Sequence, residues 1–507
     1  MSGLDEQMNE RPQASLFARR SVRWTLLVAI LLLGIGVRLI DLTDPPLDFH
    51  PVRQLRSALI ARSVYYQHTP DVSAEERQQA SDLADLEDYE PPILEQLVGW
   101  SYVLAGGEKA WLARVFNALF WAIGGLAIAG LLYRAVSFPA ILAALAFYFF
   151  LPFSVVASRS FQPEPWMVMW VLLTALALKR WAEKRSLCAA VIAGVLGGIA
   201  ILVKVVSGFF VLAMLAWVVL FALGLKKTLR SGQAWLMGLL MVLPTLGIYL
   251  FQLDRTSGFL SFWVGALSWL ITTTEFYADW LAMIKSLAGL MTLLAALLGI
   301  LTAARADKAW LLGLWSGYVL YGLVFPYQYV THEYYHLPLV GLLALSLAFA
   351  FEPVYHGLRK QPWVWRLAAA GVLVFASFYG AYVSRSILVA SDYRHEPAAW
   401  QEVGERIPQG AAFIALSGDY GMRLRYYGHR IGASWPTSGD LNLKSLSSDE
   451  VYNFKAYFDE LTAGKEYFVV TALNELNNQS DLKGYLADHY PLYYESDDFL
   501  IYQLIEK

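Results

Sequence analysis

Long apolar segments separated by short polar ones fill the first 390 positions of this 507-residue chain. A segment of about 17 to 25 apolar residues is long enough to cross a bilayer as a helix. The pattern predicts eleven such segments, at residues 24–40, 110–132, 138–157, 164–180, 187–204, 207–225, 234–253, 283–303, 309–326, 337–353 and 367–388. We therefore expect an α-helical polytopic membrane protein.

The division between the fifth and sixth segments carries much of this topology. They are almost continuous, and only the stretch from Lys204 to Ser207 interrupts them. If the two formed a single span, every later segment would cross in the opposite direction.

Basic residues gather in alternate linkers, which sets the expected orientation. One set of linkers contains Arg19, Arg20, Arg23, Arg134, Lys179, Arg180, Lys184, Arg185, Lys226, Lys227, Arg230, Arg305, Lys308, Arg359, Lys360 and Arg366. The other linkers hold isolated bases such as Arg159, Lys204 and Arg255. Because cytoplasmic loops are enriched in Lys and Arg, we expect residues 1–23 to be a cytoplasmic tail and a retained signal anchor to follow, in the plasma or inner membrane.

Composition agrees with this class and excludes others. Hydrophobic residues make up 57% of the chain and charged residues 16%, too apolar for an ordinary soluble enzyme. No nucleic-acid signature is present, and the net charge of -3 is uninformative because acids and bases are sorted along the chain. The one cysteine, Cys188, excludes an intramolecular disulfide.

Three stretches depart from the apolar pattern. Residues 41–109 form a long first outer loop within the membrane domain of residues 24–390. Residues 254–282, rich in Trp and Phe, suit a helix in the outer interface. From residue 391 to 507 the pattern becomes that of a small extracytoplasmic α/β domain, with AAFIALSG, EYFVVTA and DDFLIYQLIEK as expected strands.

The first loop contains the most concentrated polar group. Pro51 suits the first turn of a helix, and Val52 and Leu55 begin an apolar stripe at helical spacing. The start of a helix favours an anion, and Arg53 and Arg56 lie within about a turn of it. The stretch is typical of a phosphate site beside a carboxylate, or, equally well, of a solvated loop and a surface helix on the bilayer.

Polar groups also lie at the outer ends of other segments, where a charge is costly unless it is paired or used. The candidate residues are Asp48, His50, Arg53, Arg56, Arg159, Glu164, Lys204, His332, Glu333, Tyr335 and His336. Simpler interpretations remain open for Arg159 and Glu164 as loop charges and for Lys204 as a snorkelling side chain. His332, Glu333 and His336 also have a spacing that resembles metal ligation, without a supporting cysteine or second carboxylate.

Several of these motifs together resemble the GT-C superfamily of membrane glycosyltransferases, particularly the protein O-mannosyltransferases and the lipid A aminoarabinose transferases. The motifs are the acidic residue after the first segment, the paired prolines in Tyr89-Glu90-Pro91-Pro92, the Ser158-to-Glu164 loop and His332-Glu333-Tyr334-Tyr335-His336-Leu337-Pro338-Leu339. The resemblance covers the membrane region well and the C-terminal domain only in outline.

The resemblance implies transfer of a sugar from a polyprenyl-phosphate donor on the outer face to a lipid, glycan or protein acceptor. Asp48 would be the general base with Glu164 second, and Arg53, Arg56, Arg159 and Lys204 would hold the donor phosphate. The family usually has an Asp-Glu pair in the first loop, whereas Phe49 follows Asp48 here. No cofactor is assigned, a divalent metal stays an open alternative, and a role for Glu90 is not implied.

Two other classes compete with a transferase that inverts the sugar. A transporter or flippase of a lipid-linked saccharide would need charges at mid-membrane, and residues 141–157 and 287–303 are uncharged. A non-enzymatic scaffold would leave the clustering of polar groups on one side unexplained.

Overall fold

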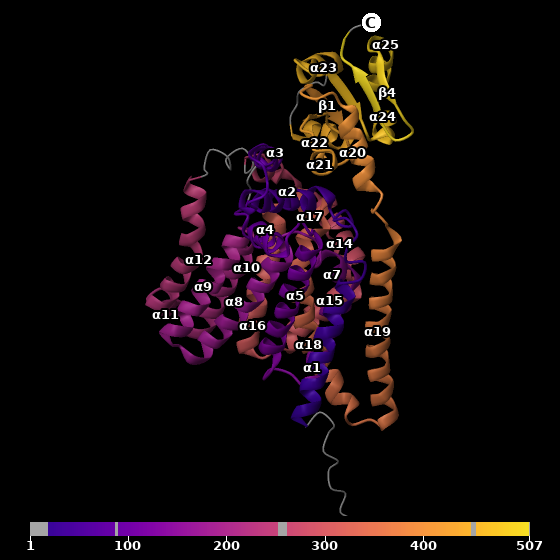
Figure 1. Cartoon of the computed structure of the whole chain (residues 1–507). Helices are drawn as coiled ribbons and strands as arrows, with labels where there is room; N and C mark the ends of the chain where they lie inside the picture. Colours follow the sequence, from indigo (N-terminus) through magenta and orange to yellow (C-terminus); the bar gives the residue numbers. More distant parts are fainter. Residues whose placement is uncertain (1–18, 87–89, 252–260, 448–452, 506–507) are drawn as a thin grey trace, which may run out of the picture.

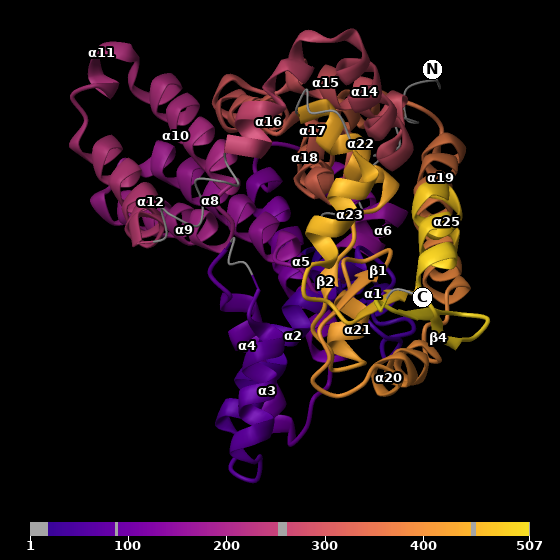
Figure 2. The same ribbon diagram turned by 90° about the horizontal axis from the view of Figure 1, so that it is seen from above.

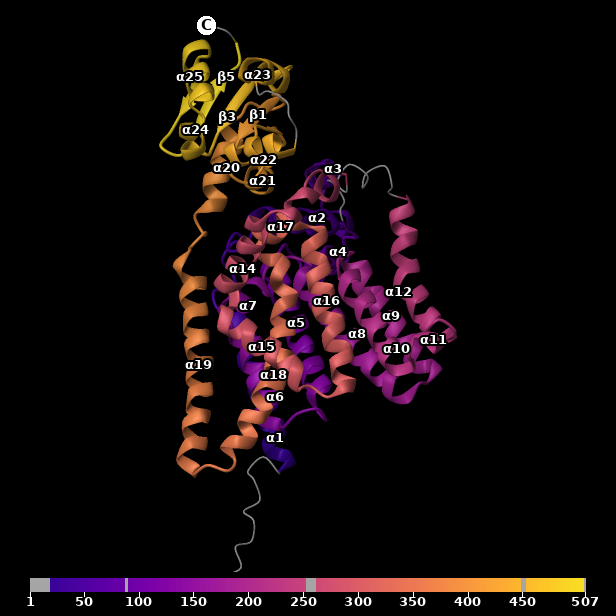
Figure 3. The same cartoon turned by 180° about the vertical axis from the view of Figure 1, so that it is seen from behind.

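The computed structural model describes residues 19–86, 90–251, 261–447 and 453–505. A bundle of helices forms the larger part, and a small domain with a sheet lies over one end of it (Figure 1). The chain crosses between the two parts at the end of the long helix α19, Trp363–Ala390 (Figure 3). The predicted segment 254–282 begins in residues 252–260, outside the described part, and the predicted tail likewise includes residues 1–18.

Helices form where the apolar pattern places them, and prolines mark several of their starts. The first part consists of α1 Arg20–Arg38, α2 Pro51–His68, α3 Ala74–Ala84, α4 Ile93–Ala105, α5 Trp111–Leu132, α6 Phe138–Phe150, α7 Pro152–Ala157, α8 Glu164–Lys184, α9 Leu187–Val203, α10 Ser207–Leu223, α11 Leu225–Thr228 and α12 Gly232–Phe251. The second part consists of η2 Ser261–Ala266, η3 Ser268–Thr272, α14 Thr274–Ala288, α15 Leu290–Thr302, α16 Arg305–Val324, α17 Pro326–Thr331, η4 Glu333–His336, α18 Leu337–Leu358 and α19. Pro51, Pro152 and Pro326 each lie in the first turn of a helix, where a missing N–H has no effect on the hydrogen bonds.

Each of the eleven predicted segments contains helix, yet their number as membrane spans is not confirmed. Among the described residues, four helices are long and apolar enough to cross a bilayer, or five if α14 and α15, bent by 95°, count as one. The predicted break between the fifth and sixth segments is present, since α9 ends at Val203 and α10 begins at Ser207. Lys204 between them has an extended backbone.

Close helix contacts depend on glycines at two crossings. A side chain at Gly299 on α15 would lie 1.9 Å from the backbone oxygen of Ser346 on α18. A side chain at Gly317 on α16 would lie 2.6 Å from the Cα of Phe210 on α10. Small residues of this kind let helix backbones approach in a membrane, where no hydrophobic force drives helices together.

The C-terminal domain contains a five-stranded sheet in the order β2-β1-β3-β5-β4. Its elements are α20 Glu396–Arg406, β1 Phe413–Leu416, α21 Met422–Tyr426, β2 Ala433–Ser434, α22 Ser438–Ser447, α23 Phe454–Thr462, β3 Tyr467–Val470, α24 Leu473–Asn478, α25 Ser480–His489, β4 Leu492–Glu495 and β5 Leu500–Gln503. Strands β1, β2 and β3 are parallel, and β5 pairs antiparallel with β3 and β4. The three stretches expected to be strands contain β1, β3 and β5.

Alternate residues of β1 enter two separate apolar cores, as a sheet covered on both faces requires. Ile414 and Leu416 face the core that contains Trp435, whereas Phe413 and Ala415 face the core that contains Val403. The domain is thus a small layered α/β unit with its own interior.

Arginines fasten this domain onto the outer loop of the bundle. Arg425 donates hydrogen bonds to the backbone oxygens of Leu83 at 2.6 Å and Asp85 at 2.7 Å. Arg62 on α2 donates to the backbone oxygen of Tyr426 at 2.6 Å and lies over the Tyr426 ring. Seen from above, the domain covers the side of the bundle opposite the wing formed by α9 to α12 (Figure 2). Helix α2 is consequently enclosed by α4, α3 and α21 and is not an open surface helix.

Candidate active site

The polar groups that the sequence placed at the outer ends of its segments come together beneath the C-terminal domain. They lie on the loop before α2, the residues before α4, the loop before α8, the break between α9 and α10, and the segment between α17 and α18 (Figure 1). Their side chains form two ionic clusters, which differ in how their carboxylates are paired.

The first group, which we name the Glu164 cluster, consists of Arg53, Glu90, Glu164 and Lys204. The Nζ of Lys204 lies 2.5 Å from Oε1 of Glu164 and 2.9 Å from Oε1 of Glu90. A guanidinium nitrogen of Arg53 lies 3.3 Å from Oε1 of Glu164 and 3.6 Å from Oε2 of Glu90. Two carboxylates and two cations, which come from four distant parts of the chain, are thus in contact with one another.

Backbone breaks place these side chains. Glu164 lies between Pro163 and Pro165 in the first turn of α8, where a negative charge is favoured by the unpaired N–H groups of the helix. Lys204 lies in the extended break between α9 and α10, which turns its side chain toward the cluster. Both residues are almost fully buried, with 2% and 4% of their surface exposed. Their charges therefore need each other.

One carboxylate oxygen of the cluster accepts no hydrogen bond from the described residues. Oε1 of Glu164 accepts from both Lys204 and Arg53, while its Oε2 is buried without a hydrogen-bond partner among the described residues. Burial alone would raise the pKa of Glu90, but Lys204 and Arg53 hold that pKa below its usual value. The ring of Tyr334 covers the two cations at 5.3 Å from Arg53 and 6.0 Å from Lys204.

The second group, the Asp48 cluster, consists of Gln54, Asp48, Arg114 and Arg159. Oδ1 of Asp48 accepts from Arg114 at 3.0 Å and from Gln54 at 3.1 Å, and its Oδ2 lies 3.4 Å from Nε of Arg159. Burial favours a raised pKa for this carboxyl, yet the two guanidinium groups hold it below the usual value. Both carboxylate oxygens of Asp48 therefore face an arginine: Oδ1 accepts hydrogen bonds, and Oδ2 is held by an ion pair.

The arginines of the Asp48 cluster also fix the backbone around them. Arg114 donates to the backbone oxygens of Leu42 at 2.9 Å and Asp44 at 2.6 Å, and Arg159 donates to those of Ile40 and Asp41. Arg159 is 1% exposed. Its donors thus hold the end of α1 to the loop before α8, a different arrangement from the predicted contact with a donor phosphate.

Gln54 links the two clusters. Its amide nitrogen donates to Asp48, and its Oε1 accepts from the backbone N–H of Phe161 at 2.9 Å, three residues before Glu164. The Asp48 cluster therefore supports the loop that carries Glu164.

His50 and the segment before α18 form an aromatic wall beside the Glu164 cluster. Nε2 of His50 lies 3.3 Å from Oε2 of Glu333, and its ring lies 4.7 Å from that of Tyr334 and 6.0 Å from that of His332. His50 has a left-handed backbone with φ of 49°, an uncommon conformation for a residue other than glycine. Burial lowers the pKa of His332 to about 4, with repulsion from His50 adding to the effect.

The other predicted pocket residues lie at different depths. His336 is completely buried, and its ring nitrogens contact the Tyr318 hydroxyl at 2.6 Å and the Tyr329 carbonyl at 2.7 Å. Because a carbonyl only accepts, Nε2 of His336 carries the proton and Nδ1 accepts from Tyr318. The ring of Tyr335 packs against that of Tyr321 at 5.4 Å. These two residues thus support the wall from behind.

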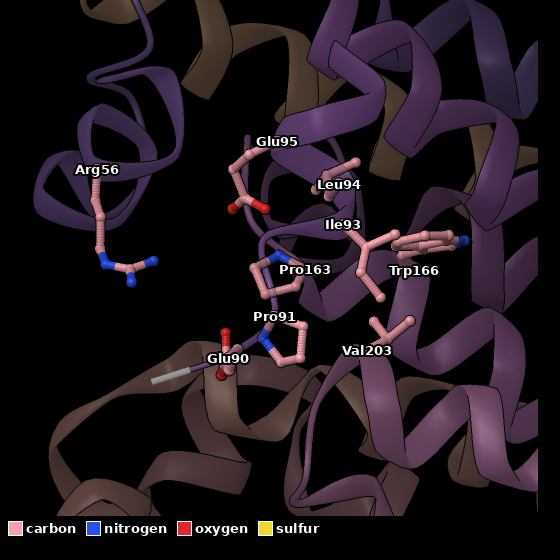
Figure 4. A pocket seen from close by; sticks show the side chains of 9 residues that line it. All are labelled: Arg56, Glu90, Pro91, Ile93, Leu94, Glu95, Pro163, Trp166 and Val203. Atoms are coloured by element: carbon pink, nitrogen blue, oxygen red, sulfur yellow. The ribbon is translucent and has the colours of Figure 1, made fainter. Parts of the chain in front are cut away.

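A small recess adjoins the Glu164 cluster. It contains about 260 Å³ of empty space and is lined by Arg56, Glu90, Pro91, Ile93, Leu94, Glu95, Pro163, Trp166 and Val203. The side chains of Arg56, Glu90 and Glu95 face it, with Trp166 forming another wall (Figure 4). Glu95 is buried and accepts a hydrogen bond of 2.7 Å from the Ser57 hydroxyl. Arg56 therefore lines the same recess as Glu90, a member of the cluster.

The donor set does not fit a metal ion bound by an acidic pair. Phe49 occupies the second position of that pair and is buried, Oδ1 of Asp48 accepts from Arg114 and Gln54, and its Oδ2 is ion-paired with Arg159. Among the described residues, no group of three or more His, Cys, Asp or Glu side chains is arranged to hold a metal.

Sequence reasoning missed Glu90, Arg114 and Gln54. Glu90 precedes the paired prolines, and the expected family pattern gave no reason to assign it. Arg114 lies at the start of an apolar segment, where a charge at the bilayer edge looks like an ordinary anchor. Only the fold shows that Arg114 points back at Asp48.

An apolar helical bundle whose buried ion pairs gather at one end, beneath a small α/β domain, has the architecture of the GT-C membrane glycosyltransferases. Residues 89–250 match the family model described as dolichyl-phosphate-mannose-protein mannosyltransferase. The resemblance drawn from the sequence motifs is thereby confirmed. No curated protein matches the chain in sequence.

Solved structures share the fold over almost the whole chain. ArnT from Cupriavidus metallidurans in the apo state has a TM-score of 0.56 at 14% identity, with 96% of this chain and 99% of that chain covered. The same protein bound to undecaprenyl phosphate has a TM-score of 0.54. The apo oligosaccharyltransferase of Archaeoglobus fulgidus has a TM-score of 0.57 at 14% identity, with 96% of this chain and 75% of that chain covered.

Proposed function

We propose that the protein transfers a sugar from a polyprenyl-phosphate donor to an acceptor hydroxyl at the outer face of the membrane. The observation that carries the proposal is the Glu164 cluster, in which two cations share one oxygen of a buried carboxylate whose other oxygen has no partner among the described residues. A transfer of this kind needs positive charge for a phosphate and a base for a hydroxyl, and the cluster contains both.

Glu164 is the better candidate for the base, ahead of Asp48. A general base must accept a proton from the attacking hydroxyl, so it needs an oxygen with free lone pairs. Oε2 of Glu164 meets this need, whereas both oxygens of Asp48 are paired. In this proposal Asp48 keeps Arg114 and Arg159 in place, and through Gln54 it supports the Glu164 loop.

Lys204 and Arg53 stabilise the leaving group. The acceptor oxygen forms a bond to the anomeric carbon while the bond from that carbon to the phosphate oxygen breaks, and the polyprenyl phosphate leaves with the electron pair. The acceptor proton moves to Oε2 of Glu164. Because the phosphate is already a good leaving group, cations suffice and no general acid is needed. A single displacement inverts the anomeric configuration.

The comparisons support the donor class in general terms. The printed ligand of one ArnT structure is undecaprenyl phosphate, and one oligosaccharyltransferase structure has a tethered acceptor peptide. For this chain we propose a polyprenyl-phosphate donor, a lipid, glycan or protein acceptor, and an orientation with the N-terminus cytoplasmic and the C-terminal domain outside. We propose that the aromatic residues of η3 and α14, which belong to the stretch rich in Trp and Phe, contact the prenyl tail.

The test is a transfer assay with purified full-length protein. It is incubated with undecaprenyl-phosphate sugars and with lipid, glycan or peptide hydroxyl acceptors, and the products are analysed by mass spectrometry and NMR. We expect free undecaprenyl phosphate and a product of inverted anomeric configuration. Translocation of the donor across proteoliposomes without any cleavage would instead indicate a flippase and contradict the proposal.

A further inference from the structure

A wide cavity that is open to solvent lies in the C-terminal domain, away from both ionic clusters. Its volume is about 540 Å³, and its lining combines carboxylates, amides, an arginine and a tryptophan. The lining residues are Trp400, Gly418, Asp419, Arg423, Thr471, Ala472, Leu473, Asn474, Glu475, Asn478, Asp497 and Asp498. We name this cavity the sheet-end crevice.

The position of the crevice in the sheet is one where ligands bind in many α/β proteins. Strands β1 and β3 are parallel neighbours, and the chain leaves β1 toward β2 on one side and leaves β3 toward β4 and β5 on the other. The loops after the two strands therefore separate at their carboxyl ends, which opens a gap at this switch point. Gly418 and Asp419 follow β1, and Thr471 and Ala472 follow β3.

The loop after β1 leads from the crevice to the side of the domain that packs on the bundle. The chain passes from β1 through Gly418 and Asp419 into α21, and α21 packs on α2. Figure 1 shows α20 and α21 on the side of the domain nearest the bundle. All lining residues belong to the C-terminal domain, and Arg423 connects the crevice to α21.

Two buried or half-buried acceptors in the crevice are held rigidly. Asp419 accepts from the Ser417 hydroxyl at 2.9 Å and from the backbone N–H of Arg423 at 2.9 Å. Glu475 accepts from the Ser438 hydroxyl at 2.6 Å and from the Gln479 amide at 3.0 Å. A site whose polar groups are fixed before binding loses less entropy when a ligand arrives.

The charges of the crevice select against anions. Four carboxylates, from Asp419, Glu475, Asp497 and Asp498, face one guanidinium, that of Arg423. A surface with this excess of negative charge repels phosphate-bearing ligands and favours neutral or cationic ones. A nucleotide, a lipid phosphate or an acidic polymer is therefore the wrong chemistry for it.

We propose that the sheet-end crevice binds a neutral or amine-bearing saccharide chain, as the non-reacting part of the acceptor. This inference rests on the proposed transferase function and specifies its acceptor class. Each sugar hydroxyl both donates and accepts, so it matches carboxylate acceptors placed beside the donors of Asn474, Asn478 and Arg423. Trp400 adds apolar ring surface to the same wall, which suits the C–H groups of a sugar.

The test measures glycan binding by the full chain in lipid nanodiscs. The labelled protein is applied to an array of neutral, amine-bearing, carboxylated and phosphorylated oligosaccharides, with an oligolysine peptide included. We expect retention on at least one neutral or amine-bearing glycan and none on the acidic ones. Absence of binding to every neutral and amine-bearing glycan, or stronger binding to oligolysine than to any glycan, would overturn the proposal.

Paired variants assign the binding to the crevice. Asn474→Ala combined with Asp497→Ala removes two exposed lining residues, and we expect at least a tenfold loss of glycan binding. Asn477→Ala combined with Asp481→Ala changes two residues on α24 and α25 that are also exposed but lie outside the lining, and binding should be unchanged. Equal binding by both double variants would place the glycan elsewhere and end the proposal.

The same preparations separate this inference from the proposed function. Both double variants should bind undecaprenyl phosphate as the wild type does, because the Glu164 cluster is untouched. Glycan binding without transfer from any polyprenyl-phosphate sugar would defeat the proposed function alone. Transfer without crevice-dependent glycan binding would defeat the crevice proposal alone.

Discussion

The Glu164 and Asp48 clusters both combine buried carboxylates with cations, but the oxygens of their carboxylates are paired differently. In the Asp48 cluster, two arginines and an amide engage both oxygens of one carboxylate, and the same arginines fasten backbone carbonyls. In the Glu164 cluster, two cations converge on a single oxygen and leave the other without a partner among the described residues. The arginines of the Asp48 cluster hold a loop, whereas the Glu164 cluster keeps a carboxylate oxygen that in our proposal meets the substrate.

This difference is the reason why we propose Glu164 as the first candidate for the base, and Asp48 only as the second. Asp48 is the acidic residue nearest the first segment, and the resemblance to GT-C enzymes favours it as the base. Its lowered pKa and its ion pairs with two arginines weigh against that role. Glu164 accepts the same type of ion pairs but keeps one lone-pair oxygen in a buried setting.

The largest expected effect is on turnover in Glu164→Gln. Removing a general base lowers the rate by about two to four powers of ten. The glutamine keeps the volume, and Glu90 still pairs with Lys204 and Arg53, so the melting temperature should fall less than in Asp48→Asn and donor binding should survive. The measurement is the rate of sugar transfer at saturating donor, together with the melting temperature of the same sample.

Glu90→Gln is the matched control for that variant. Glu90 lies in the same cluster and contacts the same Lys204, but it has no role as base in the proposal. We expect a much smaller loss of turnover. Equal losses in the two variants, or more than a tenth of wild-type turnover left in Glu164→Gln, would remove the assignment of the base.

The next effect is on stability, in Asp48→Asn. This change leaves two buried guanidinium groups without their carboxylate, and loss of one partner of a buried ion pair destabilises a protein by about 3–5 kcal/mol. The melting temperature should therefore fall, and any loss of turnover should follow the loss of folded protein. A well-folded Asp48→Asn protein with no activity would restore Asp48 as the base.

Asp41→Asn serves as the comparison for Asp48. Asp41 is also paired with an arginine, but its partner Arg394 is about half exposed, and such pairs contribute little. We expect only a slight change in melting temperature. If the melting temperature fell as far as in Asp48→Asn, substitutions anywhere in this loop would be destabilising. The loss in Asp48→Asn would then not be evidence for its buried ion pairs.

A third effect, on donor affinity, is expected from Lys204→Met. Hydrogen bonds to charged groups are worth about 1.5–3 kcal/mol, so affinity for undecaprenyl phosphate should fall roughly tenfold to a hundredfold. Lys179→Met is the control, since Lys179 forms a similar 2.6 Å pair with Asp307 between α8 and α16. The control should lose stability but keep donor affinity, measured by titration of both proteins in detergent.

The apolar pattern was enough to predict most of the helices. Each predicted segment contains helix, because apolar periodicity and prolines determine where helices begin and end in such a chain. The apolar pattern did not determine the number of membrane spans, because α6 ends at Phe150 within one predicted segment and α14 bends into α15 within another. Those breaks depend on packing and on a glycine with φ of 82° at residue 289, not on hydropathy.

The members of the site were easier to predict than their partners. A costly charge at the end of a segment marks Glu164 and Lys204 as candidates from the sequence alone. Which carboxylate meets which cation depends on contacts between residues that are 40 or more positions apart, such as Lys204 with Glu164 and Arg114 with Asp48. The sequence contains no local signal for these pairs, so only the fold shows which groups Asp48 and Arg159 contact.

The smallest expected effect is a change in acid stability in His332→Gln, and it tests whether the aromatic wall carries charge. Burial lowers the pKa of folded His332 from 6.5 to about 4. The unfolded chain therefore takes up a proton between those pH values that the folded protein does not. His332 thus lowers stability progressively as the pH falls from about 6.5 toward 4, and it has no such effect above this range.

His332→Gln removes that penalty. The melting temperature of the variant, relative to the wild type, should rise as the pH is lowered from 7 to 4.5, while the relative turnover near neutral pH should not depend on pH. His50→Gln provides a control on the same wall. A wild-type advantage that grows toward acid pH would mean that His332 is protonated in the folded state. The wall would then add a third cation beside the Glu164 cluster. Any comparison of the Glu164 cluster with the Asp48 cluster would have to include this charge.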